Sequence, residues 1–186
     1  MSAHVVAAHL DVAATRRRIV FARAAAALVW AAAIAVTAGD PGTDLSTGLA
    51  LLVTAYPVID VLASLAEASH GGEAATRLRI NAIVSSIAVV GLAVAAFGSD
   101  VGSVLAVFGS WAIASGLILF YNANKRRRQG SRELSLLVSG GLSTVAGVLI
   151  VASSNADNPN LNSIAGYATS GAVLFLVWAF RTRTSS

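Results

Sequence analysis

The stretch that decides the fold is Val101–Arg128, VGSVLAVFGSWAIASGLILFYNANKRRR, in which a long run without any charged residue leads directly into four consecutive cations. A helix rises 1.5 Å per residue, so about 20 apolar residues cross a hydrocarbon core that is ~30 Å thick. The run Val101–Asn124 therefore predicts a membrane-spanning helix that is followed by a basic cytoplasmic segment.

Five more apolar segments surround this one, and together they predict an all-α, polytopic membrane protein. The composition agrees, because a chain that is 56% hydrophobic and 12% charged, with a mean hydropathy of +0.73, lacks the polar surface that a soluble domain of 186 residues needs. The expected organisation is an N-terminal arm at 1–18, a transmembrane domain at 19–180 and a tail at 181–186. The six spans are expected near 19–38, 45–68, 78–97, 101–121, 134–153 and 161–180.

The basic residues fix the expected topology. All of the 13 Lys and Arg residues fall in segments on one side of the six-span map, whereas the other three connections carry only acids. Because cytoplasmic segments are enriched in Lys and Arg, both termini are expected in the cytoplasm. The basic residues are Arg16, Arg17, Arg18, Arg23, Arg77, Arg79, Lys125, Arg126, Arg127, Arg128, Arg132, Arg181 and Arg183, and the acids of the other side are Asp40, Asp44, Asp100 and Asp157.

The position of the cations beside apolar spans makes anionic lipid headgroups the expected partner, in preference to nucleic acid. The contact residues are expected to be Lys125, Arg126, Arg127 and Arg128. Since the chain contains no Cys, disulfides, thiolate catalysis and Cys-ligated metals are excluded. No Ser/His/Asp set, phosphate-binding Gly loop or metal-ligand spacing is present in the sequence, so we expect no enzyme activity, no cofactor and no metal.

The sequence also resembles three copies of one helical hairpin, with a period of about 55 residues. Each copy reads as a basic residue, an apolar helix, a short acidic or Gly/Pro turn and a second apolar helix. Tyr56, Trp111 and Tyr167 occupy corresponding depths, and each is followed three or four residues later by Asp60, Ser115 or Ser170.

Phe108-Gly109-Ser110-Trp111-Ala112, the Ser115-Gly116 pair, the basic segment Lys125–Arg128 and Ser139-Gly140-Gly141 with Gly147 carry a family resemblance. Together they are similar to the HdeD-like acid-resistance membrane proteins, most clearly over residues 100–180. The resemblance implies a small bacterial inner-membrane protein that is linked in some members to acid stress and has no established catalytic site. It also implies an acid before the Gly in the second helix of each unit, whereas here only Asp60 supplies one and Val61 follows it.

Small residues at helical spacing predict where the helices pack. Lipid tails give helices no hydrophobic reason to associate, so close approach depends on small side chains and interhelical hydrogen bonds. Ser139, Ser143 and Gly147 recur on one face of a helix, and Gly166 with Ser170 repeats the spacing. A polar conduit lined by Ser139, Thr144, Ser115 and Ser170 is the functional alternative, and docking of a second copy or another membrane protein also stays open.

Asp60 is the ionisable residue that lies well inside a predicted span, about 12 Å from its cytoplasmic end. An unpaired charge there costs at least ~2.5 kcal/mol, so Asp60 is expected to be neutralised or paired. Arg23 and Asn81 lie at similar depths, and the three residues form the candidate polar cluster. Its role is either structural or that of a protonatable site. The functions considered are thus a stress-linked or membrane-organising role, a small transporter or ion/proton pathway using Asp60, and an accessory subunit that docks another membrane protein.

Overall fold

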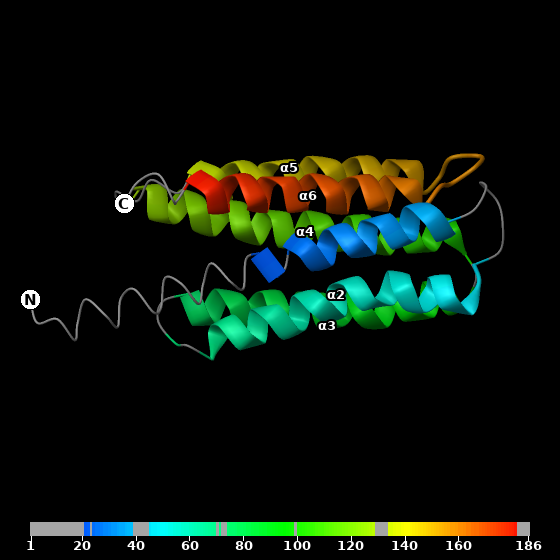
Figure 1. Ribbon diagram of the computed structural model, residues 1–186, viewed down its shortest axis with the longest axis horizontal. Coiled ribbons are helices and arrows are strands. Elements are labelled where there is room, and N and C mark those ends of the chain that lie inside the picture. The colour runs from blue at the N-terminus through cyan, green and yellow to red at the C-terminus, as the bar shows by residue number, and fades with distance from the viewer. Residues whose placement is uncertain are drawn as a thin grey trace, which may run out of the picture.

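The computed structural model describes residues 21–22, 24–38, 45–69, 71, 74–98, 100–128 and 134–181, with the side chains of 74, 134–136 and 174–181 left aside. The all-α prediction is confirmed for these residues, which form six helices that run along the long axis of the molecule (Figure 1). The predicted contact of Arg23 lies outside the described residues.

The helices follow one another through short connections. The first described helix is Ala24–Thr37. It is followed by α2 (Thr47–Ala68), α3 (Ala74–Phe97), α4 (Val101–Arg128), α5 (Leu134–Ser153) and α6 (Asn162–Arg181). The start of α2 is fixed by Ser46, whose side chain accepts a hydrogen bond from the backbone N–H of Leu49 at 3.2 Å.

Two basic segments are helical where the sequence predicted connections. The helix α4 continues to Arg128 and not to residue 121, so Lys125–Arg128 form its last turn. Likewise α3 begins at Ala74, which places Arg77 and Arg79 in its first turns. Lys and Arg are good helix formers, and the dipole favours cations at the C-terminal end of a helix, so α4 persists beyond its apolar run.

The described helices differ in how extensively they contact one another. The most extensive contacts join α4 to α5 and α2 to α3, followed by α3 with α4, whereas α5 and α6 touch only lightly. In Figure 1, α2 and α3 lie side by side below α4, α5 and α6, and the helix Ala24–Thr37 lies between the two groups. The predicted pairing of 78–97 with 101–121 is present as α3 with α4, and the three-hairpin repeat stays a prediction.

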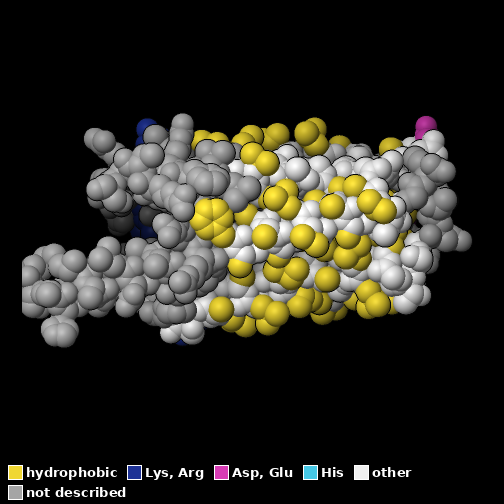
Figure 2. All heavy atoms as spheres, in the orientation of Figure 1, with side chains coloured by type: hydrophobic (Ala, Val, Ile, Leu, Met, Phe, Trp, Pro, Cys, Tyr) yellow, Lys and Arg dark blue, Asp and Glu magenta, His cyan; other side chains and the backbone are white. Residues whose placement is uncertain are grey.

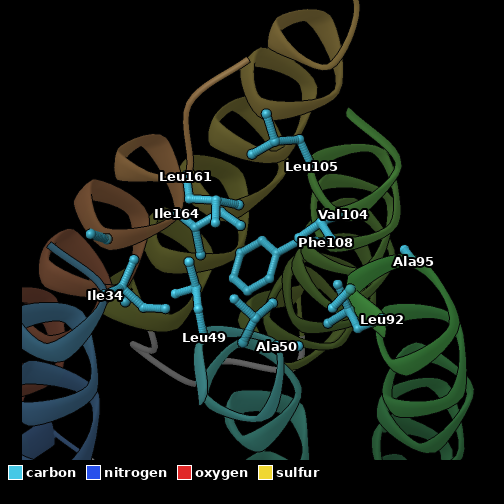
Figure 3. Close-up of a cluster of buried hydrophobic side chains, with 14 of the residues drawn as sticks. Ile34, Leu49, Ala50, Leu92, Ala95, Val104, Leu105, Phe108, Leu161 and Ile164 are labelled. Atoms are coloured by element: carbon cyan, nitrogen blue, oxygen red, sulfur yellow. The ribbon is translucent and has the colours of Figure 1, made fainter. Parts of the chain in front are cut away.

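The core centres on Phe108, which is fully buried among residues of several helices (Figure 3). Aliphatic side chains such as Ile34, Leu92 and Ile164 close around its ring. The ring centroid of Phe108 lies 5.3 Å from that of Trp111 and 5.5 Å from that of Tyr167, in edge-to-face arrangements. Aromatic contacts thus connect helices that the apolar core brings together.

The surface between the two ends of the bundle is apolar (Figure 2). Large side chains point outward, including Val36 with 84% of its surface exposed, Val94 with 73% and Leu149 with 65%. Among the described residues, α2, α3 and α4 are long and apolar enough to cross a membrane, and Ala24–Thr37 and Leu137–Ser153 are shorter apolar helices. The exposed apolar surface and the three long helices indicate a membrane protein.

Candidate functional site

A chain of polar side chains crosses the bundle from α2 through α3 to α4. The carboxylate oxygen Oδ2 of Asp60 accepts hydrogen bonds from Asn81 Nδ2 at 2.7 Å and from Ser85 Oγ at 2.8 Å. Ser85 Oγ in turn accepts a hydrogen bond from Trp111 Nε1 at 2.9 Å. Asn81 Nδ2 also donates to Ser64 Oγ at 3.1 Å. These five residues are called the Asp60 cluster below.

Helix geometry explains why these residues meet. Asp60 and Ser64 are one turn apart and lie on the same face of α2, and Asn81 and Ser85 have the same spacing in α3. Since a short connection makes α2 and α3 antiparallel, the two polar faces align side by side. Pro57 lies inside α2, one turn before Asp60 and on its buried side, where it removes a backbone hydrogen bond.

The Asp60 cluster is partly buried. Ser64 and Ser85 are the buried polar side chains among the described residues, and both are 0% exposed. Asp60 and Asn81 are half-buried. A hydrogen bond to a charged group contributes about 1.5–3 kcal/mol, roughly twice as much as a neutral one. The cluster can therefore hold three helices together where the apolar effect does not.

A second, smaller polar contact joins α5 and α6. The hydroxyl oxygens of Ser143 in α5 and Tyr167 in α6 are 2.6 Å apart. Because Ser143 Oγ donates to the backbone oxygen of Ala112 at 3.2 Å, the Tyr167 hydroxyl is the group that donates to Ser143. This contact connects α4, α5 and α6. The ring of the same Tyr167 packs against Phe108.

The positions that correspond to Asp60 in the suggested repeat have different surroundings. Ser115 Oγ is buried and has no hydrogen-bond partner among the described residues. Ser170 is exposed and donates to the backbone oxygen of Gly166 in its own helix at 2.9 Å. Thr144 likewise donates to Gly140 in its own helix. Among the described residues, Ser115, Thr144 and Ser170 thus make no hydrogen bond to one another, and the polar conduit stays a prediction.

The small residues that were expected to pack fall into two groups. Gly147 lies against α4, where a Cβ atom would sit 2.7 Å from the backbone oxygen of Gly109, and Ser143 reaches the backbone of Ala112. Ser139 is half-buried, and its neighbour Gly140 makes the close approach. Gly166 and Ser170 lie on an exposed face of α6, where nothing described lies within 4 Å of a Cβ built on Gly166.

The pairing of α4 with α5 depends on a set of glycines, of which the four-residue stripe identified Gly147. On α4 they are Gly102, Gly109 and Gly116, spaced by seven residues, and on α5 they are Gly140 and Gly147 with the same spacing. A Cβ built on Gly116 would lie 2.8 Å from the backbone oxygen of Gly140, and a Cβ on Gly140 would lie 2.6 Å from the backbone nitrogen of Phe120. The glycine spacing on α4 was the sequence signal for this face.

The predicted lipid-contact residues Lys125, Arg126, Arg127 and Arg128 lie together in the last turn of α4. Figure 2 shows Lys and Arg side chains at the end of the molecule that is opposite to a surface acid. Among the described residues there is no group of three His, Cys, Asp or Glu side chains that could hold a metal ion.

A scan against protein-family models, a search of curated proteins and a search of solved structures each gave no match. The HdeD-like resemblance therefore stays a prediction that rests on the quoted residues.

Proposed function

We propose that this chain is a six-span protein of the bacterial inner membrane with both termini in the cytoplasm. Support comes from the separation of charge along the bundle. Arg77, Arg79 and the Lys125–Arg128 turn share one end, and Asp100 precedes the start of α4 at the other end. The bias of cytoplasmic segments toward Lys and Arg gives the direction.

Reporter fusions test this topology. A reporter that is active only in the periplasm should work after Asp44, Asp100 and Asp157 and stay silent after Gly72 and Gly130. Activity at Gly130 would contradict the six-span map, because this position follows the basic turn of α4 directly.

The function that the geometry supports best is a non-catalytic role in acid-stress resistance or membrane organisation, as the HdeD-like resemblance implies. The observation that carries this proposal is the Asp60 cluster. Its hydrogen bonds run between helices in the middle of an apolar bundle, which is how membrane proteins hold helices in register. The role of Asp60 in this proposal is to keep the bundle intact under conditions that stress the membrane.

A proton or ion pathway is the second candidate, and the continuity of the same cluster favours it. Hydrogen bonds connect Trp111 through Ser85 to Asp60, so a hydroxyl lies between an indole and a carboxylate deep in the bundle. Ionisable residues inside a membrane are often part of proton relays. The two candidates predict different consequences of removing the charge.

Asp60→Asn separates them, with Glu67→Gln as the matched control. Both changes remove one carboxylate from α2, but Glu67 lies outside the Asp60 cluster. In the structural role, Asp60→Asn weakens two charge-assisted hydrogen bonds and lowers the unfolding free energy by about 1–2 kcal/mol. If Asp60 instead belongs to a proton pathway, the stability of Asp60→Asn stays close to that of the wild type, while survival in acid is lost.

The measurements are thermal unfolding of the purified protein and acid survival of a strain that lacks the gene and carries each variant. We expect Asp60→Asn to lose stability and survival together and Glu67→Gln to lose neither. Equal acid survival of the deletion strain and the wild type would contradict the stress role itself.

A further inference from the structure

The helix α4 is longer than a membrane core requires, and its excess length is basic. Its 28 residues span about 42 Å, compared with a hydrocarbon thickness of ~30 Å. If Val101 marks one edge of the core, the other edge falls about 20 residues later, near Tyr121. The last turn, Lys125–Arg128, then extends about 6–11 Å beyond that edge.

The side chains near this edge fit such a placement. Tyr121 is 68% exposed and Phe120 is 38% exposed, although both follow a long apolar run. Aromatic side chains are enriched at the level where hydrocarbon meets headgroups. The headgroup layer extends about 5–8 Å beyond the core on each side, so the basic turn begins inside this layer. The long side chains of its last residues can reach back to it.

The cations divide into those that face inward and those that face outward. Arg77 and Arg126 are half-buried, and each takes part in an interaction within the chain. Arg79, Lys125, Arg127 and Arg128 are exposed. Because α3 and α4 are antiparallel neighbours, the start of α3 brings Arg79 to the same end of the bundle as the basic turn of α4.

From this depth and charge we infer that Arg79, Lys125, Arg127 and Arg128 form a headgroup-level site for anionic phospholipids. The guanidinium group donates two parallel hydrogen bonds to phosphate oxygens, and Lys supplies a compact positive charge. Consecutive helix residues point in directions that differ by about 100°, so the basic turn presents cations around α4 and contacts several lipids. This inference rests on the proposed membrane placement, although its test does not depend on which side faces the cytoplasm.

The test is a lipid-binding measurement on the full-length protein in neutral detergent micelles. Energy transfer from the tryptophans to phosphatidylglycerol with a pyrene-labelled acyl chain reports binding, and unlabelled phosphatidylglycerol, phosphatidylcholine and glycerol 3-phosphate serve as competitors. The variant is Lys125→Gln/Arg127→Gln/Arg128→Gln. The matched control is Asn155→Asp/Ala156→Asp/Asn158→Asp, which lowers the net charge by the same amount at exposed positions of the opposite end.

We expect the Gln variant to bind phosphatidylglycerol at least tenfold more weakly at low salt, because each basic residue near a surface contributes roughly a fivefold factor. The control should stay within about twofold of the wild type, and the difference should shrink at high salt. Circular dichroism checks that the helix content is unchanged. Arg79→Gln alone should weaken binding about fivefold, and it gives a second reading if the triple variant loses helix content.

Three results would overturn the inference. Equal binding by the Gln variant would show that the basic turn makes no headgroup contact. An equal loss in the control would assign the effect to net charge and not to this surface. Displacement by glycerol 3-phosphate at the same concentration as phosphatidylglycerol would identify a site for soluble phosphate. If the reporter fusions contradict the topology but the lipid-binding measurement gives the expected result, only the proposed orientation of the protein in the membrane is wrong.

Discussion

Replacing Gly140 by Ala tests whether the close approach of α4 and α5 stabilises the bundle. The three atoms nearest to an added Cβ are backbone atoms, namely Phe120 N at 2.6 Å, Gly116 O at 2.8 Å and Phe120 Cα at 3.0 Å. Ordinary contact begins near 3.4 Å, so the two helices have to separate by about 0.8 Å at this level. No side-chain rotation relieves the clash, because the obstacle is a helix backbone.

The expected cost follows from two opposing effects. Forcing an extra carbon into a packed interface costs about 1–3 kcal/mol, with the upper part of that range expected for a backbone clash. Ala is a better helix former than Gly by about 1 kcal/mol, which offsets part of the cost. We therefore expect a net loss of about 1–2 kcal/mol, or a fall of roughly 2–8 °C in the unfolding midpoint for a chain of this size.

Circular dichroism during heating in neutral detergent measures the midpoint, and Gly166→Ala is the matched control. Nothing described lies within 4 Å of a Cβ on Gly166, so this change should leave the midpoint unchanged or raise it. Adding Gly147→Ala to Gly140→Ala should cost less than the sum of the single changes, because one helix separation relieves both clashes. If Gly140→Ala is as stable as the wild type, or Gly166→Ala is equally destabilising, the argument from close packing is wrong.

Two further predictions concern the Asp60 cluster and the start of α4. Ser85→Ala should lower the unfolding free energy by about 2 kcal/mol and Trp111→Phe by about 1 kcal/mol, because Ser85→Ala leaves the indole N–H buried without an acceptor. In a double-mutant cycle of thermal unfolding, the two losses should be less than additive. Strict additivity would count against the hydrogen bond. The hydrogen bond from the Ser103 side chain, helped by backbone N–H groups, lowers the pKa of Asp100. Its contribution to stability is present above the unfolded-state pKa of about 3.9 and is lost as the pH falls through the lower folded-state value. Wild type and Asp100→Asn should therefore differ in midpoint at pH 6 and converge at strongly acidic pH, and a constant difference would contradict the assignment.

The helical fold was predictable because hydrophobic length is a strong signal. Charge-free runs longer than a membrane core, such as Val101–Asn124, leave little choice but a helix. The span predicted near 101–121 covers the apolar part of α4, and the helix itself runs on to Arg128. Helix propensity and the helix dipole carry the backbone on through Lys125–Arg128.

The candidate site was predictable only where the depth of a residue within its predicted span was informative. Equal depth in adjacent helices suggested the neighbourhood of Asp60 and Asn81, which the structure joins by a hydrogen bond. Ser85 and Trp111 were not predicted as site residues, because Ser and Trp are common in membrane spans. Whether either side chain faces Asp60 depends on how its helix is rotated about the helix axis. That rotation depends on which helices pack together, which a repeat of hairpins does not specify.

Two different kinds of contact hold neighbouring helices of this bundle together. In lipid, apolar side chains gain nothing by leaving acyl chains for one another, so helices need another reason to associate. The α4–α5 pair uses glycines, whose missing side chains let the two backbones approach closely. The α2–α3 pair instead uses side-chain hydrogen bonds around Asp60. The glycine contacts are indifferent to charge, whereas the contacts around Asp60 depend on a carboxylate. Among the described residues, the packing of α2 on α3, with its extension to Trp111 in α4, is therefore linked chemically to one ionisable group.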